Sequence, residues 1–235
     1  RFNWGFTVGV LSSSSDYGAE ILGEFIRRAD QIGLDVLSSQ QFYPGTQELW
    51  QVISTVKSAQ ARAIVNIMDV TDMRTVIEFG ERLDMLTDRY VWICSDACAN
   101  KDLFTNIETE EVDEKLRRKF EGMIGVHFQP GHGRVYEEFL DMWEKEDPFE
   151  FPGAGKRETS FFAPYFQDAV FTYLKALSFA SAVAGATITV DNLVLSHKNV
   201  SFQGLTGWID MASNNRERLA AFDIVNLRSD SLESG

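Results

Sequence analysis

The sequence predicts an α/β protein built around a mostly parallel sheet, and three features indicate this class. Short apolar runs alternate in the first half with segments whose apolar residues recur at helical spacing. Polar loops join several of these runs to the helices that follow. Hydrophobic residues make up 44% of the 235-residue chain, which is enough for a substantial core. Strands separated by helices pair in parallel and are covered by helices on both faces.

The first half consists of repeated strand–helix units. Residues 6–11 are the first expected strand, and apolar residues at helical spacing predict a helix over residues 19–32. The same alternation predicts further strands at 35–42, 63–68 and 90–94, and helices at 50–58 and 73–86. We therefore expect these strands to share one sheet.

The second half is less regular. Residues 102–121 are charge-rich and predict a surface connection or a short solvated helix. Further expected elements are a strand at 122–128, helices at 136–143, 163–183 and 190–195, and final strands at 208–211 and 221–227. The Gly-rich break after residue 128 predicts a crossing into a second lobe, and the turn at 204–207 predicts the return.

Composition and motifs argue against several functions. The net charge of −13 and the lack of a basic stripe argue against a nucleic-acid partner. No P-loop, nucleophile elbow or dinucleotide fingerprint occurs, so we expect neither an enzyme nor a cofactor. Cys94 and Cys98 have no further ligands at zinc-finger spacing. We therefore expect two free, semi-buried thiols and no metal site.

Polar loops follow three of the expected strands, and they carry the candidate ligand-binding residues. The candidates are Ser15, Tyr17, Asp69, Ser95 and Asp96. Because parallel neighbours end at the same edge of a sheet, we expect these side chains to converge there. Serine hydroxyls and helix N-terminal amides suit a carboxylate, aspartates suit an ammonium group, and the tyrosine ring can cover a ligand. Together they would match a zwitterion such as an amino acid.

A structural interpretation of the same residues stays open. Serine and aspartate directly before a helix are the usual N-cap residues, and a capping role need not exclude a ligand contact. Asp16 in particular is expected to act in capping rather than in binding. The paired acids around residues 110–114 are expected to be a solvated face.

Segments spread over nearly the whole chain resemble a known family. They are Ser15-Asp16-Tyr17-Gly18, Tyr90 to Asp96, Tyr165 to Val170, Phe202 to Gly207 and Phe222 to Leu227. In this order they resemble the receptor-family ligand-binding region, an extracellular Venus-flytrap module related to type I periplasmic binding proteins. Metabotropic glutamate, GABA type B and natriuretic-peptide receptors carry this module.

The resemblance implies a fold of two lobes, each a mostly parallel sheet flanked by helices. Residues 1–126 would be lobe two, 127–205 the later part of lobe one, and 206–235 the return crossing and tail. Lobe one would be incomplete, because the family places a stretch of it before the SDYG-like segment. That stretch supplies Ser/Thr contacts to the ligand's carboxylate in amino-acid-sensing members. This chain would therefore hold half a site.

The resemblance also implies roles for single residues. Tyr17 matches a tyrosine that packs on the ligand, and Asp96 matches an aspartate that pairs with the ligand's amino group. Cys94 and the Ala97-Cys98 pair replace glycine and Gly-Trp of glutamate-receptor-like members, which leaves the ligand open. Asp168 matches a Tyr-Asp-Ala-Val helix in which its role is structural.

The function implied is that of a ligand-binding domain on the outer face of a cell membrane. Closure of the lobes on a small molecule would signal to an attached membrane or cyclase domain, and the receptor would be membrane-anchored and a homo- or heterodimer. Two alternatives stay open. One is a bacterial solute-binding protein serving an amino-acid or amide transporter, and the other is a scaffold or dimerisation module without a ligand.

Overall fold

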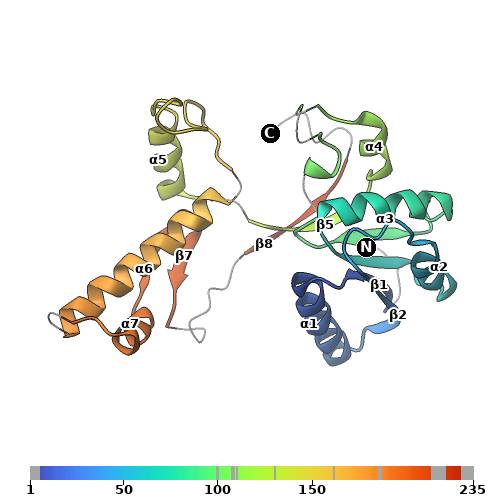
Figure 1. Cartoon of the computed structure of the whole chain (residues 1–235), viewed down its shortest axis with the longest axis horizontal. Helices are drawn as coiled ribbons and strands as arrows, with labels where there is room; N and C mark the ends of the chain where they lie inside the picture. Colours follow the sequence, from blue (N-terminus) through green and yellow to red (C-terminus); the bar gives the residue numbers. More distant parts are fainter. Residues whose placement is uncertain are drawn as a thin grey trace. The chain divides into compact units, whose positions relative to one another are not determined.

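The computed structural model describes residues 6–98, 101–106, 109, 111–129, 131–160, 162–184, 187–212 and 221–228. Contacts divide the chain into two compact units (Figure 1). Unit 1 comprises Arg1–His127 and Phe222–Gly235, and unit 2 comprises Phe128–Ala221. The chain therefore passes between the units at two places, 127/128 and 221/222.

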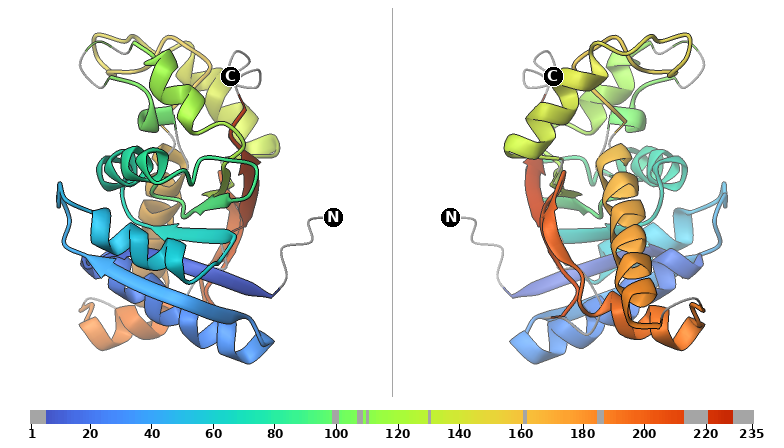
Figure 2. Two further views of the ribbon diagram at one scale, coloured as in Figure 1. Left: turned by 90° about the vertical axis from the view of Figure 1, so that its right-hand side faces the viewer. Right: turned by 90° about the vertical axis from the view of Figure 1, so that its left-hand side faces the viewer.

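Unit 1 is built on a six-stranded sheet in the order β2-β1-β3-β4-β5-β8. The strands are β1 (Thr7–Ser13), β2 (Asp35–Phe42), β3 (Ala63–Ile67), β4 (Val91–Cys94), β5 (Ile124–Phe128) and β8 (Phe222–Asn226). Strands β1 to β5 pair in parallel with their neighbours, and β1 and β2 lie side by side at one edge (Figure 2, left). This arrangement confirms the predicted α/β class.

The last strand, β8, runs against β5. Gly122 N–H donates to the Leu227 carbonyl at 2.7 Å, and Gln129 N–H donates to the Ala221 carbonyl at 2.9 Å. Residue numbers therefore increase along β5 while those of the paired residues in β8 decrease, so the two strands are antiparallel. The two passages between the units are thus hydrogen-bonded neighbours.

Helices cover both faces of the unit 1 sheet. They are α1 (Asp16–Ile32), α2 (Trp50–Ser58), α3 (Val70–Arg82) and α4 (Glu114–Lys119), with a 3-10 turn η1 (Lys101–Leu103). Val8 and Val10 of β1 pack with α1 on one face, whereas Leu11 packs with α2 and α3 on the other. This alternation follows from the two-residue period of a strand. The short α4 lies within the charge-rich segment predicted to be a connection or a short helix.

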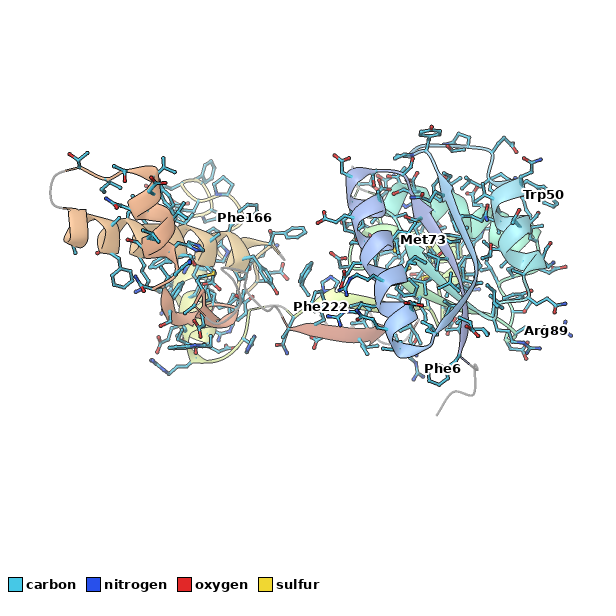
Figure 3. The ribbon with its side chains drawn as sticks, turned by 90° about the horizontal axis from the view of Figure 1, so that it is seen from below. Phe6, Trp50, Met73, Arg89, Phe166 and Phe222 are labelled. Atoms are coloured by element: carbon cyan, nitrogen blue, oxygen red, sulfur yellow. The ribbon has the colours of Figure 1, made fainter. Side chains whose placement is uncertain are left out.

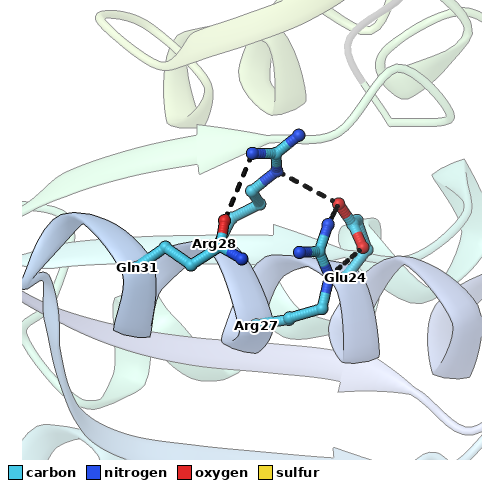
Figure 4. A network of polar contacts seen from close by, with 4 residues as sticks. All are labelled: Glu24, Arg27, Arg28 and Gln31. Carbon is cyan, nitrogen blue, oxygen red and sulfur yellow. Dashed lines mark hydrogen bonds and ion pairs between the residues drawn. The ribbon is translucent and has the colours of Figure 1, made fainter.

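The outer surface of α1 carries a small ion-pair network (Figure 4). Glu24 accepts from Arg27 Nε at 2.8 Å and from Arg28 Nε at 3.3 Å, and Arg28 also donates to Gln31. All of these side chains are exposed, so solvent and salt screen the pairs and they contribute little to stability. The network marks the solvated side of α1, opposite the side that packs on the sheet.

Unit 2 contains α5 (Arg134–Trp143), α6 (Ala163–Ala184), α7 (Val190–His197), β6 (Ser201–Gly204) and β7 (Gly207–Asp210). Helices α6 and α7 lie side by side and line an apolar pocket of about 250 Å³. Strands β6 and β7 form an antiparallel hairpin. Several large apolar side chains of α6 are exposed, including Phe166 at 72% (Figure 3). No helix in the described part of the chain is both long and apolar enough to span a membrane.

The Asp168 carboxylate of α6 holds the turn between β6 and β7. It is 4% exposed and accepts from Leu205 N–H at 2.8 Å and from Thr206 N–H at 2.9 Å. The Thr206 hydroxyl also donates to it. The role expected for Asp168 from the resemblance was structural, and these contacts are of that kind.

The hairpin differs from the expected chain path in two respects. Strand β6 was not predicted, because Ser201–Gly204 is too short and polar to show a strand pattern. The return was expected at the 204–207 turn, but β7 pairs with β6, and the chain re-enters unit 1 only at Phe222. A carboxylate more than thirty residues away in sequence holds this turn, and local sequence cannot reveal that contact.

Candidate ligand-binding site

The loops after β1, β3 and β4 meet at one edge of the unit 1 sheet. Strand β3 lies directly between β1 and β4, and all three run in the same direction. Their carboxyl ends are therefore neighbours, which is where α/β sheets hold ligands. This placement of the three loops is the one predicted from the sequence.

The structure brings Tyr17 and Asp96 into direct contact. The Tyr17 hydroxyl donates a hydrogen bond of 2.6 Å to Asp96 Oδ1, although the two residues are 79 positions apart. Tyr17 lies in the first turn of α1, and its ring packs near the small apolar cluster under that helix. Asp96 lies in the turn that follows β4. Both side chains are partly exposed.

The local surroundings hold the Tyr17 hydroxyl in its protonated form. Burial and the hydrogen bond to Asp96 raise the pKa of Tyr17 far above its ordinary value of 10.0, although contacts with Ser95 and the Ala97 amide oppose this rise. The phenol is therefore a fixed donor at neutral pH. It donates to Asp96 Oδ1 and so orients that side chain.

This pKa gives a testable pH dependence. Folding raises the pKa of Tyr17 above 10.0, so the stability that it contributes is complete below that pH and is lost as the pH rises further. In a near-ultraviolet absorbance titration, wild type and Tyr17→Phe should develop the same tyrosinate signal until alkaline unfolding begins. The expectation is contradicted if folded wild type gives a tyrosinate absorbance that exceeds that of Tyr17→Phe by the contribution of one tyrosine out of the six in the chain.

Ser95 shares the Tyr17–Asp96 contact. Its hydroxyl interacts with Tyr17 and lies 3.8 Å from Cys98 Sγ, and its amide donates to the Asn66 carbonyl at 2.9 Å. The turn at 95–98 is thereby tied to the end of β3. Three of the predicted residues, Tyr17, Ser95 and Asp96, thus form one cluster.

The other two predicted residues are engaged by their own helices. Ser15 is the N-cap of α1 and accepts from Gly18 N–H at 3.1 Å. Asp69 is the N-cap of α3 and accepts from Asp72 N–H at 2.9 Å. The structure therefore places both at the predicted edge but gives them the capping role that the sequence left open.

Asp72 belongs to the loop expected after β3, but the sequence did not single it out as a functional residue of this edge. Its buried carboxylate accepts from Gly45 N–H at 2.8 Å and so holds the loop after β2 against α3. Burial raises the pKa of Asp72. One feature of the sequence could have drawn attention to Asp72: it lies three residues after the N-cap Asp69, the position at which a capping box has an acidic residue.

A hollow lies at the opposite edge of the same sheet. It has a volume of about 600 Å³ and is lined by Leu86, Tyr90 and Trp92 together with charged residues of both signs. Tyr90 precedes β4, whereas Asp96 follows it, so the two regions are at opposite ends of that strand. No cluster of His, Cys, Asp or Glu that could hold a metal occurs among the residues that the structure describes.

The family of the chain follows from a match that covers nearly all of it. Residues 1–230 match the family described as the receptor family ligand binding region. The chain belongs to this family. Family membership confirms the resemblance recognised from the motifs, and it identifies the chain as a ligand-binding domain.

Similar solved structures confirm the fold. A leucine-binding protein from Thermotoga maritima matches with a TM-score of 0.69 and 16% identity over 95% of this chain and 57% of its own. A periplasmic binding protein type 1 from Bordetella pertussis Tohama I matches with a TM-score of 0.67 and 14% identity. This match covers 96% of this chain and 59% of that protein. The chain thus spans less than two thirds of either protein. No curated protein sequence matches it significantly.

Proposed function

We propose that the chain is the small-molecule-binding part of an extracellular receptor domain, with its ligand held at the Tyr17–Asp96 edge of unit 1. The observation that carries the proposal is the 2.6 Å hydrogen bond that joins these two distant side chains. A carboxylate that is partly exposed, oriented by a half-buried phenol and placed at the carboxyl ends of parallel strands has the features of a recognition group.

The chemistry of this edge favours an amino acid or a related amine. The second Asp96 oxygen can pair with an ammonium group, and the Tyr17 ring can cover the ligand's carbon skeleton. Ser95 adds a hydroxyl beside them. Since Ser15 and Asp69 cap their own helices, we expect them to shape the site rather than supply its main contacts.

The proposed receptor would be anchored in a membrane and would act as a dimer. Ligand binding would shift a conformational equilibrium and pass the signal to an attached membrane or cyclase domain. The hydrogen-bonded passages at Gln129 and Ala221 are suitable places for such a movement. A periplasmic solute-binding protein is the second candidate, because one similar structure is a leucine-binding protein and the other is a periplasmic binding protein type 1. The coding sequence around this chain would distinguish the two: a membrane helix followed by an effector domain supports the receptor.

The test is a thermal-shift screen of the protein against the standard amino acids and simple amines. We expect at least one ligand to raise the melting temperature of wild type. In Asp96→Asn this shift should disappear, because the amide cannot form the charge pair. Tyr17→Phe should weaken binding, because the Asp96 carboxylate then loses the hydroxyl that orients it.

Asp88→Asn is the matched control, since Asp88 is an exposed aspartate at the other end of β4. It removes the same charge and should keep the full shift. Full ligand-dependent stabilisation of Asp96→Asn would overturn the assignment of Asp96. Loss of the shift in both variants would show an effect of net charge instead of a specific contact.

A further inference from the structure

Two buried cysteines flank the turn that carries the candidate recognition residues. Cys94 is the last residue of β4, and Cys98 closes the turn through Ser95 and Asp96. Their side chains are 1% and 0% exposed, and both are free thiols. The sequence predicts free thiols at these positions without a role for them.

The turn folds back so that Cys98 returns to the end of β4. The Cys98 amide donates to the Ser95 carbonyl at 3.1 Å, and the Cys98 thiol lies 3.5 Å from the same oxygen. A turn of this kind brings its first and fourth residues, here Ser95 and Cys98, close together, and Ser95 directly follows Cys94 in the chain. Close approach of two Cα atoms is the first requirement for a disulfide.

Both cysteines also lie against one residue of the neighbouring strand. Cys94 is the register partner of Asn66 on β3, and Cys98 Sγ lies 3.8 Å from the Asn66 carbonyl. The Ser95 amide donates to the same carbonyl at 2.9 Å. Asn66 therefore adjoins the backbone of Cys94 and the thiol of Cys98, while the Cys94 thiol itself lies 2.9 Å from Met123 Sδ.

The protonation of Cys94 agrees with this placement. Burial raises the pKa of the Cys94 thiol well above its usual value, and the neighbouring Cys98 thiol raises it further. Such thiols are poor nucleophiles, because the thiolate is the species that attacks a disulfide. Two buried thiols of this kind are therefore better suited to a stable disulfide, formed during folding or when the turn opens locally, than to rapid thiol–disulfide exchange.

We propose that Cys94 and Cys98 are a disulfide-forming pair whose oxidation locks the Ser95–Asp96–Ala97 turn. The oxidant is a small-molecule disulfide of the glutathione class. One protein thiolate attacks it, forming a mixed disulfide and releasing one small thiol; the second protein thiolate then displaces the other small thiol. The two protein thiols lose two electrons and two protons, and the small disulfide is reduced to two thiols. The physiological relevance rests on the proposed extracellular location, where disulfides persist.

The consequence for the candidate site is a fixed position of Asp96. Without the cross-link, Cys98 is held by the turn hydrogen bond and by weak contacts of its thiol. A covalent bond between the two ends of the turn removes most alternative conformations of Ser95 and Asp96. The Asp96 carboxylate would then stay in the position that accepts from Tyr17.

The test equilibrates the 235-residue protein in glutathione buffers from reducing to oxidising, starting from both the reduced and the oxidised protein. Samples are acid-quenched, unfolded, alkylated and mapped by peptide mass spectrometry. We expect oxidising buffers to give a Cys94–Cys98 peptide that has lost two hydrogens and carries no glutathione. Hydrogen exchange of the amides at 95–98 should be slower in the oxidised protein.

Cys98→Ser is the matched variant and should instead give a free or glutathionylated Cys94. If this variant fails to fold, the wild-type titration still decides the question. Alkylation of both cysteines at equilibrium in the most oxidising buffer, or glutathione on each of them, would overturn the proposal. Because mass reports the disulfide without any ligand, its absence leaves the proposed function standing. A disulfide in a protein that binds no amine would count against the proposed function alone.

Discussion

Replacing Asp168 with alanine is expected to destabilise unit 2 by about 3 kcal/mol, because buried amides that lose their acceptor cost about 1–3 kcal/mol each. The carboxylate accepts from the Leu205 and Thr206 amides and from the Thr206 hydroxyl. Alanine supplies no acceptor for any of them. Asp168→Asn should recover part of the loss, since its oxygen can accept from one amide while its NH₂ faces the other donors.

The measurement is urea denaturation, combined with hydrogen exchange at Leu205 and Thr206 to locate the loss. Asp191→Ala is the control, because Asp191 is an exposed aspartate in the first turn of α7 and should change stability by only a few tenths of a kcal/mol. The account of the turn is wrong if the two variants unfold at the same urea concentration.

Gly18→Ala is expected to be the most damaging small substitution in unit 1, at about 3 kcal/mol, the upper part of the usual range for overpacking. A Cβ at residue 18 would lie 2.0 Å from the Ser13 carbonyl oxygen. A backbone atom cannot rotate away as a flexible side chain can, so the start of α1 must move. That movement should also displace Tyr17 from Asp96.

The same helix offers a matched control. A Cβ at Gly23 has no neighbour within 4 Å, so Gly23→Ala should stabilise α1 by about 0.5–1 kcal/mol through helix propensity. Urea midpoints should therefore move in opposite directions for the two variants. A stabilised Gly18→Ala would show that α1 tolerates displacement, and the packing argument for this glycine would fail.

The fold of unit 1 was predictable because its signals are local. Apolar runs, helical periodicity and cap residues sit next to one another in the chain, and parallel order then follows from the strand–helix alternation. The same signals located the loops at the ends of β1, β3 and β4. The resemblance then gave Tyr17 and Asp96 separate contacts with a ligand, and the structure joins the two side chains by a 2.6 Å hydrogen bond that was not predicted.

Contacts between distant residues were harder to predict. Asp72 holds the loop at Gly45, and Asp168 holds the turn at Thr206, yet neither partner lies near its carboxylate in sequence. Strand β6 exists because it pairs with β7, although its own sequence is short and polar. The sequence predicted helix capping by Ser15 and Asp69 as an alternative to ligand binding. The structure shows the hydrogen bonds that cap α1 and α3.

Chemical-shift mapping of amide signals during titration with the standard amino acids tests the central claim most directly. It reports weak binding and locates the ligand in the same experiment. We predict that a ligand perturbs amides at 15–18 and 95–98 and leaves the opposite edge around Tyr90 and Lys115 unchanged. Perturbations confined to the hollow lined by Tyr90, Trp92 and Lys115 would contradict the claim that the Tyr17–Asp96 edge binds the ligand.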